Sequence, residues 1–425
     1  MRFLFYLRIK SFIKLFPVII FFYSLCYVWL QFNDKHLPNG ENEPQNYDLV
    51  EETSTSVYDV NFIKESIEIK NREQIILNSD KFGSLRANDT IIVIQVHNRI
   101  QYLTFLIESL KLTVGIEKAL LIFSHDVFDL RLNNLIESID FCKVLQIFYP
   151  YSLQVFTNTF PGPDVKDCPR NIDKQQALLM KCINAEFPDT YGHYREARYT
   201  QTKHHWFWKI NHIFDYLNVT NGHTGFILFL EEDHYAAPDM LHVLHLMISN
   251  KLMLCETCDV FTLGSYTKSF NYALNANKVE IQKWSSSKHN MGFAFNRNSW
   301  NKVKSCAKKF CEYDDYNWDW SLQHISLKCL KTPLVTVAVI APRVFHIGEC
   351  GVHHKGKNCG NNKLVLKVKR TLSVSRNYLF PSSLTQQKVS KRVYKMSKVN
   401  GGWSDKRDHQ FCFKHVKQVT RSVPH

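Results

Sequence analysis

Between Thr90 and Pro150 the sequence alternates short apolar runs with amphipathic stretches, and few folds accommodate such an alternation. The apolar runs have the length of buried strands, and apolar residues recur with helical spacing in the stretches between them. Strands that alternate with helices form a parallel sheet with right-handed crossovers. The sequence therefore predicts an α/β fold. The expected strands are residues 90–96, 118–126 and 142–150, and the expected helices are residues 101–112 and 129–139.

Polar side chains come directly after several of the expected strands. The stretch His97 to Arg99 follows the first strand, and Asp126 ends the second. Farther along, the apolar run Phe226–Leu230 leads straight into three acids, Glu231 to Asp233. Ligands of parallel α/β sheets bind outside the carboxyl ends of the strands. We therefore expect these groups to lie on one rim of the sheet and to form the ligand site.

The second half of the chain is less regular. Further helices are expected at residues 202–217 and 318–330, and a further strand at residues 258–265. After Lys363 the sequence becomes basic and polar. We expect this part to wrap the core, with Cys412 available to link it back.

The N-terminal segment is predicted to be a membrane anchor. Basic residues precede the uncharged, aromatic-rich run Phe16–Leu30, whose length approaches a short membrane span. Positive charge on the near side predicts a cytoplasmic N-terminus and a lumenal remainder. The alternative, a cleaved signal peptide, requires small residues at a cleavage site, and the sequence CYVWLQFND offers none. The predicted organisation is a cytoplasmic tail (1–14), a transmembrane signal anchor (15–32), a lumenal stem (33–87) and a catalytic domain (88–425).

The cysteines fit a lumenal domain. Of the 12 cysteines, ten lie between Cys168 and Cys412, while Cys26 lies in the expected anchor and Cys142 stands alone in a strand-like stretch. An oxidising compartment would pair most of this set and leave an odd thiol. The CETC sequence that begins at Cys255 could suggest zinc, but no second CxxC is placed to complete four ligands. A local disulfide or a free pair is therefore expected there.

Two further features bear on the surroundings of the chain. Asn88 and Asn218 begin N-glycosylation acceptor triplets, which also suits a lumenal protein. The formal net charge of +14 invites a nucleic-acid partner, but none is available behind a membrane anchor and no recognition motif accompanies the charge. The charge indicates either a generally basic surface or affinity for anionic ligands such as nucleotide phosphates.

The three acids from Glu231 to Asp233 pose an electrostatic problem, because like charges at a buried strand end repel unless a cation receives them. Side chains alternate along a strand, so Glu231 and Asp233 would point to one side and Glu232 to the other. Carboxylates suit Mg²⁺ or Mn²⁺, which take one or two protein carboxylates and fill other positions with water and substrate phosphate. The alternative is a solvated turn whose acids favour the N-terminus of a following helix.

Three other stretches carry candidate chemistry. His346, directly after an apolar stretch, could bind a first-row metal, although a lone histidine is more often packed or exposed without one. Asp315 and Asp319 would share a helical face among aromatic residues, and either could act as a base or cap the helix. The stretch Thr200 to Lys209, at an expected helix N-terminus, could contact phosphate or sugar hydroxyls.

Together, these stretches resemble one family, the N-acetylglucosaminyltransferase II family. In order across residues 90–412, the resemblance rests on VHNR, SHD, FYPYS, FPGPDVKDCPR, CINAEFPDTYGHYREAR, QTKHHWFWK, LFLEEDHYAAPD, HNMG, YDDYNWDW, FHIGECGVHH and NGGWSDKRDH. Several of these motifs are long and rich in rare residues, whereas the anchor and stem match only in kind. The segment near Lys268 to Asn275 departs from the family pattern, so no substrate contact is carried onto it.

The resemblance implies a GT-A type glycosyltransferase fold, with a Rossmann-like mixed sheet and an acceptor-binding half. It implies a Golgi membrane enzyme that uses UDP-N-acetylglucosamine and Mn²⁺. The implied reaction is inverting: it adds GlcNAc in β1,2 linkage to the α1,6-arm mannose of an N-glycan that already carries GlcNAc on its α1,3 arm.

The resemblance also implies roles for particular residues. Asp233 and His346 match the family's metal ligands, and Asp319 matches its catalytic base. The matching donor contacts are Gln95, Val96, His97, Asn98, Arg99 and Asp126, and a further substrate-contacting stretch comprises Gln201, Thr202, Lys203, His204 and His205. The implied disulfides join Cys168 with Cys182, Cys255 with Cys258, Cys306 with Cys329, Cys311 with Cys412, and Cys350 with Cys359, leaving Cys26 and Cys142 unpaired.

Three alternatives compete with this function. A related transferase could act on another arm or another glycan. A lumenal glycan-binding protein without catalysis would lack a carboxylate or the metal site, whereas Asp233, Asp319 and His346 are all present. A glycoside hydrolase would use two carboxylates but would need neither the metal nor a basic donor rim.

Overall fold

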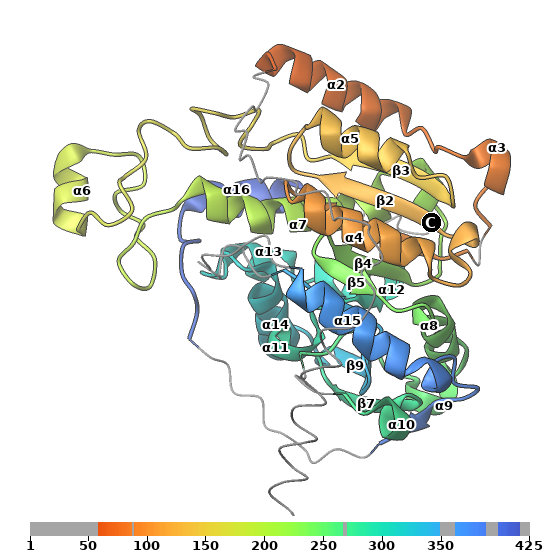
Figure 1. The fold of residues 1–425 in the computed structure, drawn as a ribbon. Coiled ribbons are helices and arrows are strands. Elements are labelled where there is room, and N and C mark those ends of the chain that lie inside the picture. The colour runs from red at the N-terminus through yellow and green to blue at the C-terminus, as the bar shows by residue number, and fades with distance from the viewer. Residues whose placement is uncertain (1–57, 87–88, 267–269, 349–361, 388–397, 417–425) are drawn as a thin grey trace, which may run out of the picture. The chain divides into compact units, whose positions relative to one another are not determined.

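The computed structural model describes residues 58–86, 89–266, 270–348, 362–387 and 398–416, and within them a nine-stranded sheet carries helices on both faces (Figure 1). The strands are β1 (Ile91–Val96), β2 (Leu120–His125), β3 (Lys143–Phe148), β4 (Ile227–Glu231), β5 (His234–Ala236), β6 (Val260–Thr262), β7 (Lys278–Lys283), β8 (Phe293–Phe295), β9 (Val335–Val339), β10 (Val344–His346) and β11 (Thr385–Gln386). β10 and β5 form a separate two-stranded sheet.

The helices lie between and after these strands. They are α2 (Val60–Glu73), α3 (Ser79–Phe82), α4 (Ile100–Lys111), α5 (Leu130–Glu137), α6 (Lys174–Met180), α7 (Ala197–Asp215), α8 (Met240–Ser249), α9 (Lys251–Cys255), α10 (Tyr272–Asn275), α11 (Ser286–His289), α12 (Arg297–Lys304), α13 (Ala307–Glu312), α14 (Trp318–Lys328), α15 (Lys363–Val374) and α16 (Lys406–Lys414). Short 3-10 turns are η1 (Ile116–Lys118), η2 (Asn218–Thr220) and η3 (Arg376–Tyr378).

The large sheet is mixed, with the strand order β11-β7-β9-β6-β8-β4-β1-β2-β3. Strands β1 to β4 run parallel, as the alternating sequence predicts. β8 lies between β4 and β6 and runs antiparallel to both, and β7 runs antiparallel to β9. The mixed sheet implied by the family resemblance is therefore confirmed. The antiparallel strand β8 was not among the expected strands, because it has only three residues and gives no periodic signal in the sequence.

Residues of the central strands alternate between two hydrophobic clusters. Ile92 and Ile94 join the cluster that includes apolar residues of α4, α5 and α8. Ile91 and Val93 join the cluster that includes α7, α12, α13 and α14. Because helices cover both faces, these strands are apolar throughout and lack the alternation of a half-exposed strand.

Residues 58–86 of the predicted stem lie in the same compact unit as the predicted catalytic domain. The compact unit begins at Tyr58, and α2 packs against β3 within it. Ile63 and Ile67 of α2 are buried with Phe148, and the Asn71 side chain bonds both the N–H and the carbonyl of Phe148. The polar composition of residues 33–87 concealed this helix, because only two of its residues are buried. The tail, the anchor and residues 33–57 lie outside the described residues.

Four of the five implied disulfides are present in the structure. They join Cys168 with Cys182, Cys255 with Cys258, Cys306 with Cys329, and Cys311 with Cys412. The last links α16 back to α13, as expected, and Cys142 is a buried free thiol. The pair Cys350 and Cys359 lies outside the described residues. Among the helices that are described, none combines the length and the apolar character that a membrane span requires.

Candidate functional site

Three neighbouring parallel strands end at one rim of the large sheet. β1 lies between β2 and β4, and Gln95 pairs in register with Ser124 and with Glu231. The residues that follow the strands are joined by backbone hydrogen bonds: Asp126 N–H donates to the Val96 carbonyl at 3.2 Å, and Glu232 N–H donates to the Gln95 carbonyl at 3.0 Å. The side chain of Val96 is buried, and Asn98 is exposed beside it. The structure thus brings the expected groups together on one rim.

Asp126 gathers polar side chains from the loop after β1 and from α7. Its carboxylate oxygens lie 2.6 Å from His97 Nδ1, 3.2 Å from Gln201 Nε2 and 3.6 Å from His205 Nδ1. The charge of Asp126 raises the pKa of His97 to about 9, so His97 is a cation at neutral pH. Burial opposes ionisation of Asp126, but the charges and hydrogen bonds of His97 and His205 hold its pKa below the usual range.

Helix α7 divides the stretch Gln201 to His205 between two environments. Gln201 and His205, four residues apart, share the face that reaches the rim. Lys203 points elsewhere and donates to the carbonyls of Tyr313 and Asp315 at 3.0 Å each. His204 Nε2 lies 2.8 Å from a carboxylate oxygen of Asp408 on α16, and Thr202 is half-buried. Lys203 and His204 therefore support the C-terminal half of the fold and lie away from Asp126.

Lys209, one turn beyond His205, is a buried amine near the rim. Its Nζ donates to Gln95 Oε1 at 2.6 Å. Burial lowers the pKa of Lys209, and the charge of Glu231 opposes this. Lys209 thus compensates part of the negative charge that the three acids bring to the end of β4.

Glu232 orients the loop that follows β1. Its side chain accepts hydrogen bonds from the His97 backbone N–H at 2.8 Å and from Arg99 Nε at 2.6 Å. Arg99 also donates through Nη1 to Asp233 Oδ2 at 2.7 Å. Each of these donors takes a different carboxylate oxygen of Glu232, which is 1% exposed. Its role, which the sequence left open, is to hold Arg99 in place.

The two-stranded sheet brings His346 to Asp233. In the antiparallel pair of β10 and β5, His346 stands opposite His234, the residue that follows Asp233. His346 Nε2 lies 3.2 Å from Asp233 Oδ2. Burial would raise the pKa of Asp233, but the hydrogen bond and charge of His346 and the charge of Arg99 hold it below the usual range. Asp233 is therefore an anion that faces a histidine from a distant part of the chain.

The donor atoms around Asp233 fit a divalent cation. Asp233 Oδ1 is buried and has no hydrogen-bond partner among the described residues. Two ligands in adjacent octahedral positions around Mg²⁺ or Mn²⁺ are about 3 Å apart, which is close to the separation of Asp233 Oδ2 and His346 Nε2. One ligand atom from each of Glu231, Asp233 and His234 also lies within 4.8 Å of the other two. However, His234 Nδ1 accepts the Glu231 N–H at 3.1 Å, which places the ring proton on Nε2 and leaves His234 no lone pair for a metal.

Gly348 allows the strand that carries His346 to pass close to Asp233. A Cβ atom built on Gly348 would collide with Asp233 Oδ2. The backbone N–H of Ile347 donates to the Asp233 carbonyl at 2.9 Å, so the two segments cannot separate without losing this bond. Only glycine therefore fits at this position of the FHIG sequence.

We expect the Gly348→Ala variant to fold but to lose about 100-fold in transfer rate, because displacing a reacting group by about 1 Å costs this much. Transfer rate and thermal unfolding should be measured together. Gly225→Ala is the matched control: its Cβ would meet only the His223 ring, at 2.9 Å, and transfer should stay normal. If the Gly348→Ala variant transferred at the wild-type rate, the close approach of Gly348 to Asp233 would not matter for the reaction, which contradicts this prediction.

Asp319 stands in the first turn of α14 and is half-buried. Its Oδ1 accepts the Trp320 backbone N–H at 2.9 Å, and its Oδ2 accepts Asn290 Nδ2 at 2.8 Å. Burial raises the pKa of Asp319 to about 6, although both hydrogen bonds lower it. A carboxylate with such a pKa is suited to general-base work near neutral pH.

Asp315 is the acid that periodicity could not separate from Asp319. It lies before α14 begins, so the two do not share a helical face, and that expectation is wrong. Its side chain is buried and accepts hydrogen bonds from Asn317 and Asn400. Asp315 therefore anchors the loop, and Asp319 is the acid that a substrate can reach.

Tyr266 connects the two parts of the site. Burial raises the pKa of Tyr266, and the charges of Glu231, Asp319 and Asp233 raise it further. The phenol therefore feels the charges of the general-base candidate and of the acids at the end of β4, and Tyr266 lines the same pocket as His346. Tyr266 is 51% exposed, which leaves it accessible to a substrate.

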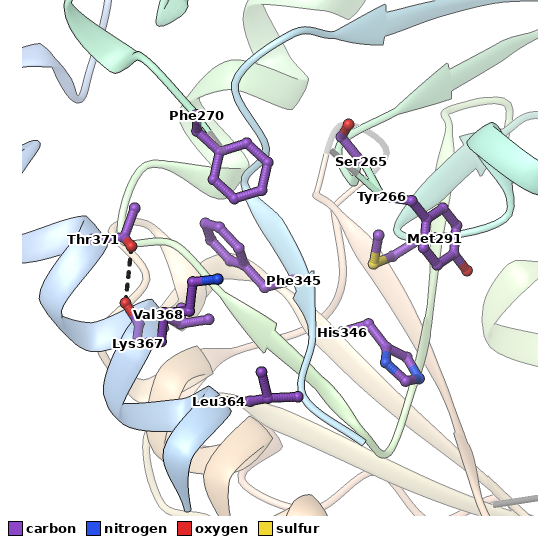
Figure 2. Close-up of a pocket in the computed structure, with 10 residues that line it drawn as sticks. All are labelled: Ser265, Tyr266, Phe270, Met291, Phe345, His346, Leu364, Lys367, Val368 and Thr371. Atoms are coloured by element: carbon purple, nitrogen blue, oxygen red, sulfur yellow. Dashed lines mark hydrogen bonds between the residues drawn. The ribbon is translucent and has the colours of Figure 1, made fainter. Parts of the chain in front are cut away.

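A pocket of about 290 Å³ opens beside His346 (Figure 2). Tyr266, Met291 and Ser265 form one side, and side chains of α15 form the other, over Phe345. The remaining lining residues are Phe270, Leu364, Lys367, Val368 and Thr371. The pocket is mostly apolar with one ammonium group, and it borders the cation-binding group.

Sequence reasoning included Lys209 only as the end of the stretch from Thr200, and it missed three residues of the site: Tyr266, Asn290 and Gly348. HNMG and FHIG contain the last two, but glycine and asparagine in a motif do not reveal what they contact. No local pattern in the sequence reveals what Tyr266 or Lys209 contacts. Of the predicted glycosylation sites, Asn218 is exposed, and Asn88 lies outside the described residues.

Comparisons with known proteins show the family of this chain. The family described as N-acetylglucosaminyltransferase II matches residues 64–412. The alpha-1,6-mannosyl-glycoprotein 2-beta-N-acetylglucosaminyltransferase of Rattus norvegicus is 46% identical over 343 residues, which cover 80% of this chain and 77% of the relative. The Homo sapiens protein of that name is 42% identical over 371 residues (87% and 80%), and the Arabidopsis thaliana protein is 34% identical over 347 residues (79% and 76%).

Likeness to solved structures is weaker. S. aureus TarS in complex with UDP-GlcNAc has a TM-score of 0.32 and 10% identity, covering 68% of this chain and 66% of TarS. This likeness is too low to bear on the site.

Proposed function

Because this chain belongs to the N-acetylglucosaminyltransferase II family, we propose that it transfers GlcNAc from UDP-GlcNAc in β1,2 linkage to the α1,6-arm mannose of an N-glycan that already carries GlcNAc on its α1,3 arm. The observation that carries the proposal is Asp319, a reachable carboxylate with a raised pKa, near the separate pair of Asp233 and His346. Transfer from a nucleotide sugar to a hydroxyl needs both a base and a group that receives the diphosphate.

Asp319 acts as the base. Its carboxylate takes the proton from the mannose 2-hydroxyl as that oxygen attacks the anomeric carbon. Attack comes from the face opposite the departing UDP, so the configuration inverts in one displacement and no covalent intermediate is needed. A pKa of about 6 leaves Asp319 ionised at neutral pH while keeping it a stronger base than an ordinary aspartate.

Asp233 and His346 are the proposed ligands of Mn²⁺, with Glu231 beside them. When bound, the cation neutralises charge that develops on the departing diphosphate. Arg99 keeps Asp233 oriented through its bond to Oδ2 and is itself held by Glu232. Two observations support the proposed ligand set. Asp233 Oδ1 has no hydrogen-bond partner among the described residues, and Asp233 Oδ2 lies 3.2 Å from His346 Nε2.

The rim formed by β1 and β2 is the proposed nucleotide side of the donor site. His97 and Asn98 are exposed there, and the positive charge of His97 suits a phosphate. Asp126 with Gln201 offers acceptors and donors for a polar base or ribose. Lys203 and His204 serve this site through the fold of α7 rather than by contact.

We propose that part of the substrates binds in the pocket beside His346 (Figure 2). Its apolar walls, including Met291 and Phe345, suit the carbon-rich face or N-acetyl methyl of a sugar. Lys367 adds a positive charge at its edge.

We place the protein in the Golgi membrane, with residues 15–32 as the anchor and the domain from Tyr58 in the lumen. The apolar run Phe16–Leu30 supports the anchor, and the disulfides support an oxidising compartment. Glycosylation at Asn88 and Asn218 and a bond between Cys350 and Cys359 belong to the same proposal. Nucleic acid is not a proposed partner.

An assay with two defined acceptors tests the function. The soluble domain from residue 58, with UDP-GlcNAc and Mn²⁺, should transfer to an N-glycan that carries GlcNAc on its α1,3 arm and has a free α1,6-arm mannose. An otherwise identical glycan without the α1,3-arm GlcNAc should be a poor acceptor. The product linkage should be β1,2 by NMR.

Three outcomes would overturn the proposal. Equal transfer to both acceptors would indicate a related transferase with another arm specificity. Release of free GlcNAc without transfer would favour a hydrolase, and binding of the glycan with no reaction would favour a glycan-binding protein.

A further inference from the structure

A short segment around α11 contacts the helix that carries Asp319 at two points. The Ser286 backbone N–H donates to Gln323 Oε1 at 2.8 Å, and Asn290 Nδ2 donates to Asp319 Oδ2 at 2.8 Å. Asp319 and Gln323 are four residues apart on α14 and share one face of it. Two parallel hydrogen bonds therefore attach this segment to the face that presents the base.

The two attachments differ in their surroundings. Gln323 is 3% exposed, so its bond to Ser286 lies inside the protein. Asn290 and Asp319 are both half-buried, so their bond lies where the fold opens to solvent. The first is an anchor of the fold, whereas the second is placed where substrates arrive.

Asn290 itself is held in position from both sides. It ends α11, in which His289 Nδ1 accepts the Ser285 backbone N–H at 2.9 Å. On its other side, the Met291 carbonyl accepts the Gly264 N–H at 3.1 Å. The Asn290 amide is therefore fixed by the backbone before any substrate binds, which is the preorganisation that catalytic sites require.

The oxygen of the same amide is left unpaired. Asn290 Oδ1 is buried and has no hydrogen-bond partner among the described residues. Because an unpaired buried acceptor is costly, such groups in native proteins generally meet a partner from water or a ligand. The nitrogen of the amide donates to Asp319, and the Asn290 side chain also hydrogen-bonds the Tyr266 phenol. The oxygen has no partner among the described residues and is available to a hydroxyl or an amide N–H of a substrate.

We propose that Asn290 is a positioning residue for the transfer reaction. Its amide N–H fixes the Asp319 carboxylate, and its oxygen accepts a hydrogen bond from a hydroxyl or amide N–H of a bound sugar. This inference rests on the proposed function, in which Asp319 is the base.

The bond has a predictable effect on the pH dependence. A donor to the ionised carboxylate stabilises that form, so removing the donor raises the pKa of Asp319. The groups that face Asp319 are the Trp320 N–H on its own helix, the charge of Asp315 from the preceding loop, and the neutral phenol of Tyr266. The Trp320 N–H already donates to Oδ1, so it does not replace the donor that Oδ2 loses. Activity that needs ionised Asp319 is lost as pH falls through its pKa, so the acid limb of the rate profile moves to higher pH.

The test uses the soluble domain from residue 58, with UDP-GlcNAc, Mn²⁺ and the preferred acceptor. Two variants remove the donor: Asn290→Leu, which leaves an apolar group of similar size, and Asn290→Asp, which adds a second carboxylate. We expect the acid limb of kcat/KM to move up by about one pH unit in the leucine variant, and further in the aspartate variant because of like-charge repulsion. Affinity for UDP with Mn²⁺, measured by calorimetry, should change less than about twofold, since neither variant touches Asp233.

Ser287→Ala is the matched control, because Ser287 lies in the same helix and is exposed, away from Asp319. Its acid limb should coincide with that of the unmodified enzyme. A folded Asn290 variant whose acid limb stays at the unmodified position would overturn the inference while leaving the proposed function intact. An unmodified enzyme that transfers no GlcNAc would instead overturn the proposed function, and the inference with it. Two variants of different chemistry keep the test decisive if one of them fails to fold by thermal unfolding.

Discussion

Asp319→Asn is expected to lower kcat by a factor on the order of 10² to 10⁴, because the amide cannot take a proton from the mannose hydroxyl and a general base contributes about this much. The change is nearly isosteric. The amide oxygen can still accept the Trp320 N–H, so α14 should keep its place. The drop should be measured with saturating UDP-GlcNAc and acceptor, so that it reports on the reaction and not on binding.

Binding and stability separate this role from a structural one. Affinity for UDP in the presence of Mn²⁺ should be nearly unchanged, and so should the thermal unfolding midpoint. Glu312→Gln, an acid-to-amide change on the exposed surface of α13, should retain full transfer. An active Asp319→Asn variant would remove Asp319 from the reaction.

Asp233→Ala is expected to weaken Mn²⁺-dependent binding of UDP by more than about 100-fold, since it removes a ligand and not merely an outer partner, whose loss costs 10- to 100-fold. Transfer should fall with it. The measurement is UDP titration by calorimetry, with Mn²⁺ and again with a chelator. The difference between the two conditions should shrink in the variant.

Two further measurements test whether the loss of UDP binding reports on Asp233 as a ligand. Asp140→Ala removes an acid whose side chain is 73% exposed and should leave both titrations unchanged. Thermal unfolding should accompany the Asp233→Ala titration, because Arg99 loses one of its carboxylate partners in that variant. Unchanged Mn²⁺ dependence in a folded Asp233→Ala variant would count against Asp233 as a ligand.

The strands and helices of the first half could be read from the sequence because their signals are local. The apolar runs that become β1, β2 and β3 are buried on both faces, and the helices between them are amphipathic. The placement of His97, Asp126 and Glu231 on one rim followed from the same rule, since parallel strands end together. The strand β8 and the packing of α2 did not follow, because three residues and a mostly exposed helix carry too little pattern.

The sequence by itself determined the kinds of groups at the end of β4. The expected alternation does not extend to Glu232 and Asp233, because β4 ends at Glu231 and the Arg99 guanidinium bonds both of the carboxylates that follow. Only the tertiary structure decided what each acid meets. Arg99 donates a hydrogen bond to Glu232. The pairing of β10 with β5 places His346 beside Asp233, and the segment after α11 places Asn290 beside Asp319. The physical reason is that alternation and helical spacing are set by the backbone of one element, whereas these contacts join elements far apart in the chain.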